Sequence, residues 1–329
     1  MADSFRIGAI EVDQGTKKWA SLNVAERPLT SINVPITIVN GVRSGPVLCV
    51  IAGEHPNEYA GIEACIRLSR TIRPEELTGK LLILPVINVP GFESRTPYVS
   101  PLDRVNLSIT QTRWSRKPSF PSISHIMLYN LYNSVITKSD YLIRLHGGDI
   151  CESMIPCTYI TKPKSGKTKT FDSAKNLAKA FSMAGIKYIV EYDVQAELEE
   201  ELEIPTIGPE TGGEGKLEEE DVTILYNGVL NVMKYLRMID GELMRVVEPK
   251  IAHNSGFVST ERGGLFYAHV KVGDIVSKGD ILGEIRNIKG ETLEELEAPQ
   301  KGMIFFKSNP LPWDASLGWF LFHIVDVEE

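Results

Sequence analysis

The chain has 329 residues, 43% hydrophobic and 24% charged, a composition typical of a globular protein large enough for about two domains. Its 43 acidic residues outnumber its 35 basic ones and leave a net charge of −8, which argues against nucleic acid as the main partner, because phosphate binding needs a basic face. No apolar run approaches the ~18 residues of a membrane helix, and the first residues show no secretory signal, so a cytoplasmic location is predicted.

The order of predicted elements indicates the fold class. Residues 4–41 are rich in strand and turn signals. The predicted strands that follow are 46–52, 80–88, 140–149, 186–192 and 204–213, and the predicted helices are 58–72, 122–137, 173–185 and 217–238. Strands that alternate with helices predict an α/β fold, with a mixed, largely parallel sheet covered by helices.

Two segments depart from this alternation. The stretch from 89 to about 118 is rich in Pro, Ser and Arg and shows no periodicity, and loops of this length are usually functional or disordered. After Pro249 the chain returns to short strands with a turn every eight to twelve residues. We therefore predict an α/β domain at 1–250, with a strand-rich part at 1–41, and an all-β domain at 251–329.

Three predicted strands end in residues that can carry chemistry. The first ends in "GEHPNE", with His55 and Glu58; another ends in "HGGD", which begins at His146; the last ends in "ETGG", which begins at Glu210. In parallel α/β sheets, ligands bind at the carboxyl ends of the strands, so these side chains are expected to meet.

Two imidazoles and one carboxylate, with one position left open, form a common catalytic zinc site. A tight H-x-x-E loop can direct His55 and Glu58 at one ion, and His146 can arrive from a neighbouring strand end. Plainer alternatives exist for each part. Glu58 could cap the helix that follows it, His146 could be a hydrogen-bonded core histidine, and Glu210 could be a solvated acid in a glycine-rich turn.

These segments resemble a known family. "GEHPNEYAG" resembles the G-x-H-G-N-E-x-x-G stretch of the succinylglutamate desuccinylase/aspartoacylase family, which is related to zinc carboxypeptidases. "RLHGGD" resembles its D-L-H-x-G segment and "GPETGG" its segment with the catalytic glutamate, in matching order over about 45–240. The part at 251–329 resembles the barrel-sandwich, lipoyl-like module that often closes this family.

The resemblance implies a carboxypeptidase-like fold and one Zn²⁺ per chain, held by His55, Glu58 and His146. It also implies that Glu210 is the general base and acid, which takes a proton from the attacking water and gives it to the leaving amine. Arg95, in "FESRTPY", is the candidate for stabilising the developing oxyanion, with a solvated loop arginine as the alternative.

The sequence departs from the family where the substrate carboxylate is usually held. Members carry N-L-N-R there, and this chain has "NLSI", so Asn106 is retained while Ser108 and Ile109 replace the Asn-Arg pair. Serine and isoleucine cannot replace a bidentate guanidinium. Either the substrate lacks that carboxylate, or a nearby arginine substitutes, for which the candidates are Arg104, Arg113 and Arg116.

A second departure lies before the third metal ligand. Arg144 stands where the family has an aspartate, and at strand period two its side chain shares the face of His146. We expect it to contact substrate or to form an ion pair with an acidic neighbour. Asp149 could orient His146 as a hydrogen-bond acceptor, or could serve the turn.

Other motifs are rejected. "SGKTK" at 165–169 lacks the first glycine of a nucleotide-binding loop. The C-terminal module lacks a carrier lysine, since Lys301 is not at a hairpin tip with the carrier motif. The family resemblance implies instead that this module walls the entrance to the site and restricts substrate size. No disulfide framework is apparent, and the remaining cysteines and histidines are expected to be structural, namely Cys49, Cys65, Cys151, Cys157, His253, His269 and His323.

The leading functional hypothesis is a zinc hydrolase that cleaves the amide of a small N-acylated amine or amino acid. One alternative is a metallocarboxypeptidase acting on peptides, which the missing arginine disfavours. Another is a relative that binds metal and ligand without turnover. The predicted partner is a small N-acyl substrate, neither nucleic acid nor a membrane is expected, and a homo-oligomer is left open.

Overall fold

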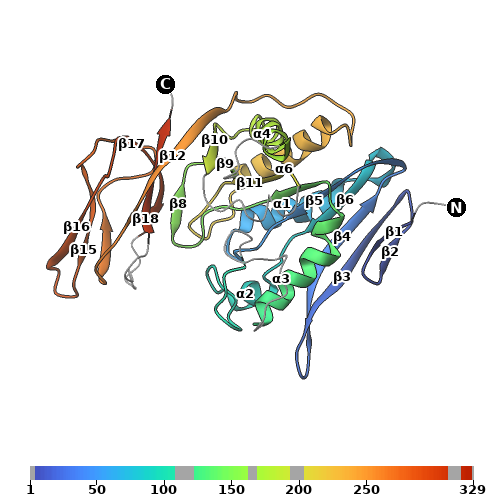
Figure 1. Ribbon diagram of the computed structural model, residues 1–329, viewed down its shortest axis with the longest axis horizontal. Helices are drawn as coiled ribbons and strands as arrows, with labels where there is room; N and C mark the ends of the chain where they lie inside the picture. The colour runs from blue at the N-terminus through green and yellow to red at the C-terminus, as the bar shows by residue number, and fades with distance from the viewer. Residues whose placement is uncertain (1–3, 108–121, 162–168, 193–203, 310–319, 328–329) are drawn as a thin grey trace.

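The computed structural model describes residues 4–107, 122–161, 169–192, 204–309 and 320–327 (Figure 1). The strands are β1 (Phe5–Ile7), β2 (Ile10–Val12), β3 (Thr16–Glu26), β4 (Ser31–Asn40), β5 (Arg43–Ile51), β6 (Thr78–Leu84), β7 (Tyr141–Arg144), β8 (Glu152–Met154), β9 (Cys157–Thr161), β10 (Tyr188–Tyr192), β11 (Thr206–Glu210), β12 (Lys250–Ser259), β13 (Leu265–Ala268), β14 (Ile275–Val276), β15 (Ile281–Arg286), β16 (Thr292–Glu297), β17 (Gly302–Ser308) and β18 (Phe320–Val327). The helices are α1 (Tyr59–Thr71), α2 (Val89–Ser94), α3 (Ile123–Ser134), α4 (Lys169–Ser182) and α6 (Glu219–Tyr235), with short 3₁₀ turns η1 (Pro74–Glu76) and η2 (Ile136–Lys138). None of the helices among these residues is long and apolar enough to cross a membrane.

One mixed sheet organises the α/β part of the chain. Its strand order is β12-β10-β9-β11-β7-β5-β6-β4-β3, with β11, β7, β5 and β6 parallel to one another and β9, β10 and β12 parallel in a second group. The two groups meet at the antiparallel pair β9–β11, and β4 and β3 add an antiparallel edge. The predicted mixed α/β fold is confirmed, and the carboxyl ends of β5, β7 and β11 lie side by side.

Both faces of this sheet are buried, which explains the continuous apolar runs in the sequence. Side chains alternate between faces along each strand. Leu48 and Val50 of β5 therefore join one core, whereas Cys49 and Ile51 join the other. Helices α1, α4 and α6 cover the first face, and α3 covers the second together with residues of β1 to β4 (Figure 1).

The C-terminal part is built from strands and has its own core. β13, β15 and β16 form a three-stranded sheet, while β14, β17 and β18 extend the large sheet beyond β12. Buried side chains such as Leu282, Ile304 and Phe322 form its interior. Strand β12 pairs with β10 at its start and with β18 along most of its length, so it links the two parts (Figure 1). The domain boundary at 250/251 and the barrel-sandwich assignment remain predictions.

Three elements were absent from the expectations. Helix α2 lies in the long segment for which no periodicity was found, and it is only six residues long. Strands β8 and β9 begin six and eleven residues after His146 and are three and five residues long. Elements this short carry too few residues for a helical or alternating pattern to emerge.

Candidate metal centre and active site

The loop between β5 and α1 places the first two candidate ligands. Gly53 ends the strand with φ of 63°, a conformation that glycine adopts without strain. The Glu58 amide then donates to the His55 carbonyl at 3.4 Å, which closes a tight turn. Glu58 does occupy the N-cap position of α1, but its side chain makes no capping hydrogen bond. Its carboxylate is therefore available for another purpose, and the expected alternative of a capping Glu58 is wrong.

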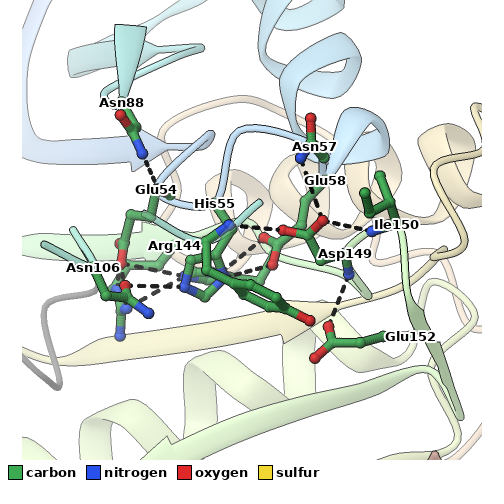
Figure 2. A network of polar contacts seen from close by, with 12 residues as sticks. Glu54, His55, Asn57, Glu58, Asn88, Asn106, Arg144, Asp149, Ile150 and Glu152 are labelled. Atoms are coloured by element: carbon green, nitrogen blue, oxygen red, sulfur yellow. Dashed lines mark hydrogen bonds and ion pairs between the residues drawn. The ribbon is translucent and has the colours of Figure 1, made fainter. Parts of the chain in front are cut away.

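The Glu58 carboxylate lies between two histidines. Its Oε1 is 2.6 Å from Nδ1 of His55, and its Oε2 is 2.9 Å from Nδ1 of His146. The two imidazole rings are 5.2 Å apart. One ligand atom from each of the three residues lies within 4.8 Å of the others. Figure 2 shows the His55 and Glu58 side chains directed toward one another in this network. The predicted convergence is thus present, and the group could bind a metal ion.

The chemistry of these side chains fits a divalent cation such as zinc. A neutral imidazole has one nitrogen that carries hydrogen and one with a free lone pair. In both histidines Nδ1 faces the shared centre, and each Nε2 faces an acceptor. The Nε2 of His55 lies 3.3 Å from Asn106 Oδ1, and that of His146 lies 3.5 Å from Glu54 Oε2. Because each Nε2 can donate to its acceptor, each Nδ1 can offer its lone pair to an ion.

The electrostatics agree with a site that attracts positive charge. Burial on its own lowers the pKa of His146, but the carboxylates of Glu58 and Glu54 outweigh it and raise the pKa to about 10. Burial also acts to lower the pKa of His55, but the Glu58 carboxylate outweighs burial, so the pKa of His55 is raised as well. Burial acts to raise the pKa of Glu58, whereas the two histidines bring it below its usual value. The buried carboxylates therefore favour positive charge at this point, which a bound cation could supply.

Glu210 reaches the same place from β11. Strands β7 and β11 are parallel, and beyond β7 His146 forms an isolated bridge with Glu210. The His146 amide donates to the Pro209 carbonyl at 2.9 Å, and the Thr211 amide donates to the His146 carbonyl at 3.3 Å. Burial raises the pKa of Glu210 to about 8, and His146 opposes that shift. The structure thus places a carboxyl group of raised pKa beside one of the candidate ligands.

Arg144 forms a bidentate ion pair with a buried carboxylate, while its assignment to substrate binding stays a prediction. Its Nε and Nη2 donate to the two carboxylate oxygens of Glu54 at 2.7 and 2.6 Å, and both side chains are buried. Burial raises the pKa of Glu54, but Arg144 and then His146 outweigh burial and hold that pKa well below its usual value. The alternative expectation, an ion pair with an acidic neighbour, is confirmed, and Glu54 is the neighbour that sequence reasoning missed.

Asp149 does not orient His146. Its carboxylate accepts from the side chain of Asn57 at 3.3 Å and from the backbone amides of Ile150 and Tyr98 at 2.5 and 3.1 Å (Figure 2). The acceptor that faces His146 is Glu54. Asp149 instead holds together the loops that enclose the site, which is the turn role that was left open for it.

Two of the substrate-binding candidates contact the ligand cluster, Asn106 through His55 and Arg144 through His146. Arg95 and Arg104 are exposed and adopt φ of 53° and 58°, and within the described residues neither forms a hydrogen bond or ion pair with a candidate ligand. Arg95 ends helix α2 as its C-cap. Four residues considered with the missing Asn-Arg pair lie outside the described residues, namely Ser108, Ile109, Arg113 and Arg116.

Two further residues beside the site were not anticipated. Tyr98 has φ of 55°, which is uncommon for an aromatic residue, and its ring centroid lies 5.7 Å from that of His55. Glu152 accepts from the Asp149 amide at 2.8 Å, and burial raises the pKa of Glu152 to about 7. Neither belongs to a recognisable motif, because Tyr98 lies in the aperiodic segment and β8 is too short to detect.

The cysteines and the other histidines stay outside the cluster. All four cysteines are free, as expected, and Cys151 Sγ contacts the Tyr98 hydroxyl at 3.1 Å. His323 is buried in the C-terminal part and stacks on Phe257. The rejected "SGKTK" motif lies almost entirely outside the described residues.

The sequence was compared with known families and with characterised proteins. Residues 44–236 match the model of the succinylglutamate desuccinylase/aspartoacylase catalytic domain. The N-alpha-acetyl-L-2,4-diaminobutyric acid deacetylase of Halomonas elongata is 25% identical over 297 residues, which cover 85% of this chain and 82% of the relative.

Solved structures show the same fold over nearly the whole chain. A succinylglutamate desuccinylase/aspartoacylase from Rhodobacter sphaeroides superimposes with a TM-score of 0.82 at 23% identity, covering 97% of this chain and 99% of that one. The product-bound ectoine utilization protein EutE (DoeB) from Ruegeria pomeroyi has a TM-score of 0.83 at 22% identity, covering 99% of this chain and 98% of that one.

Proposed function

Because this chain belongs to the succinylglutamate desuccinylase/aspartoacylase family, we propose that it is a zinc-dependent hydrolase that cleaves the amide bond of a small N-acylated amine or amino acid. One observation carries the proposal. The side chains of His55, Glu58 and His146 converge, and the strand end beside His146 carries Glu210. Deacylation is the activity named for the curated relative, which makes hydrolysis of an N-acyl group the reaction to expect.

His55, Glu58 and His146 would hold the ion, and they leave the fourth position open for water or substrate. When bound there, zinc would supply a Lewis acid that lowers the pKa of water toward about 7 and polarises the scissile carbonyl. The three ligands come from two strand ends that the sheet fixes next to each other. The chain therefore contributes a preorganised donor set, with little rearrangement needed on binding.

Glu210 would act as the proton carrier. It accepts a proton from the attacking water and delivers it to the amine as the carbon–nitrogen bond breaks. Its raised pKa makes the protonated form more accessible near neutral pH than it is for an ordinary glutamate, which suits delivery of the proton to the amine.

One alternative keeps the metal centre but has no turnover. It is favoured by the environment of the arginines, since Arg144 is engaged with Glu54 while Arg95 and Arg104 are exposed. Among the described residues, no other arginine contacts the candidate ligands. A metallocarboxypeptidase, which must hold a terminal carboxylate, is disfavoured on the same ground.

The test is release of free amine by the zinc-loaded protein from a panel of N-acyl amino acids, N-acyl diamines and short peptides. N-acetyl-2,4-diaminobutyrate is the first substrate to try, because the curated relative is named for it. Glu210→Gln should abolish turnover while zinc binding is retained. The control is Glu220→Gln, the same substitution at an exposed position of α6, which should leave the rate unchanged.

Each outcome decides between the candidates. Turnover of N-acyl compounds that is lost in Glu210→Gln supports the hydrolase. Zinc binding without release of amine from any compound supports the ligand-binding alternative, and release from peptides alone supports the carboxypeptidase. A protein that binds no zinc contradicts all three.

A further inference from the structure

A buried ion pair joins the two strand ends that carry the candidate histidine ligands. Glu54 follows the end of β5 and immediately precedes His55, and its side chain is 1% exposed. Arg144 is the last residue of β7, and its side chain is 10% exposed. The pair is bidentate, with distances of 2.7 and 2.6 Å (Figure 2). Two parallel nitrogen–oxygen contacts fix both the distance and the orientation of the two groups.

His146 lies against this pair. Its Nε2 is 3.5 Å from Glu54 Oε2 and 3.3 Å from Arg144 Nη2, while its Nδ1 faces Glu58. A guanidinium can only donate hydrogen bonds, so a hydrogen on Nε2 can be directed only at Glu54. Arg144 Nη2 can donate to Nε2 when that nitrogen is bare, so without an ion the two neighbours favour opposite tautomers. Once an ion takes the lone pair of Nδ1, the hydrogen must lie on Nε2, and Glu54 is then the group that accepts it.

The two histidines differ in the acceptor that their Nε2 atoms face. His55 faces the neutral amide oxygen of Asn106, whereas His146 faces a carboxylate that is itself held by a cation. A carboxylate acceptor raises the basicity of an imidazole ligand more than an amide does, because it stabilises positive charge on the ring. His146 should accordingly be the stronger of the two imidazole donors.

We infer that Glu54 is a positioning residue, which sets the tautomer and direction of His146 for metal binding, and that Arg144 holds Glu54 in place and does not grip substrate. The inference rests on the proposed function for the identity of the ion. Glu54 and Arg144 would both affect the affinity for the metal, and neither would contact the reacting atoms of the substrate. A pair that merely stabilised the fold would have no effect on zinc binding once the protein is folded.

The experiment compares the zinc affinity of variants in which a positive charge and a negative charge are removed together. The double variant Glu54→Gln/Arg144→Gln removes both charges together, since removing one alone would leave the other buried and unpaired. Metal-free protein is titrated with Zn²⁺ against a chromophoric chelator, and folding is checked by circular dichroism. The control is Lys175→Gln/Glu191→Gln, which removes a pair of 2.6 Å between α4 and β10.

The double variant should bind zinc roughly 10–100-fold more weakly than the wild type, the usual effect of losing an outer partner of a ligand. The control should stay within about threefold. Glu54→Asp, which keeps the charge, should recover part of the loss, and the absorption spectrum of the Co²⁺-substituted protein should shift in the double variant but not in the control. A folded double variant with wild-type zinc affinity would overturn the inference.

If the double variant does not fold, the wild type provides the test. Nitrogen-15 NMR of the zinc-loaded protein should show that Nε2 of His146 carries the hydrogen and that Nδ1 binds the metal. The reverse assignment would overturn the inference. These readouts do not depend on catalysis, so a protein that binds zinc but cleaves no amide would contradict the proposed function and leave the role of Glu54 standing.

Discussion

The Oε2 atom of Glu58 lies 2.9 Å from Nδ1 of His146, although the two residues are 88 positions apart in the chain. The contact exists because β5 and β7 are parallel neighbours, so their carboxyl ends deliver side chains to one point. It also shows why Glu58, which is at the start of a helix, does not cap it. The carboxylate bridges two imidazoles instead.

We expect Glu58→Gln to weaken zinc binding by at least about 100-fold, more than the loss of an outer partner would. An amide lacks the negative charge that offsets the cation, and it keeps nearly the same volume. The measurement is competition with a chelator of known affinity. Glu63→Gln, one turn further along α1, is the control and should bind zinc as the wild type does. Equal affinity in both variants would remove Glu58 from the ligand set.

Gly147→Ala should separate the strand ends that carry His146 and Glu210. A Cβ at this position would lie 2.3 Å from the Thr211 carbonyl oxygen, and backbone atoms cannot move away cheaply. We expect a loss of about 1–3 kcal/mol in unfolding free energy, measured by urea denaturation, together with reduced zinc affinity. Gly208→Ala is the control, since its Cβ would meet its nearest neighbour at 3.9 Å, an ordinary contact.

Stability should fall in mild acid because of His323. Burial lowers the pKa of this histidine to about 4, below the value of 6.5 that it has when exposed. The folded state holds the neutral ring, so its contribution is complete above pH 6.5 and is lost as the pH falls from 6.5 toward 4. The loss should be on the order of 3 kcal/mol, at about 1.4 kcal/mol for each pH unit.

The measurement is the unfolding free energy as a function of pH in His323→Gln and in the wild type. The variant should show a flatter dependence between pH 6.5 and 4, whatever its stability at neutral pH. His253→Gln, at an exposed position of β12, is the control and should keep the wild-type slope. An unchanged slope in His323→Gln would contradict the assignment.

Asn231→Leu should destabilise the packing of α6. The buried Asn231 amide donates to the carbonyls of Ala180 and Met244 at 3.1 and 2.8 Å and accepts from the Met244 amide at 2.8 Å. Leucine has similar volume but leaves these backbone groups without partners. We expect a loss of about 2–4 kcal/mol, since each unsatisfied buried group costs about 1–3 kcal/mol. Asn227→Ala, on the same helix and partly exposed, should change the melting temperature much less.

The order of the main elements and the zinc-ligand candidates followed from the sequence. Continuous apolar runs predicted the buried strands, and residues with ligand chemistry at three of their ends predicted a site at one edge of the sheet. These signals lie in short stretches of sequence, so they can be recognised without knowledge of the fold. The same reasoning identified His55, Glu58 and His146, and the family resemblance added a role for Glu210. The structure brings the first three residues within 4.8 Å of one another.

Pairings between distant residues could not be read from the sequence in this way. The sequence suggested an acidic partner for Arg144 but did not identify it, because only the register of β5 and β7 brings Glu54 to that side chain. Arg95 and Arg104 carry the guanidinium that substrate or oxyanion binding needs, but both side chains are exposed. Their positions could not be predicted, because the path of a loop without sequence periodicity depends on its tertiary packing.

The sequence by itself determined which strands are buried and which residue types stand at their ends, because burial and side-chain alternation are written in the local order of apolar and polar residues. Only the tertiary structure decided which carboxylate faces which imidazole. That choice depends on strand order and register, and these are set by contacts between segments that the chain keeps far apart.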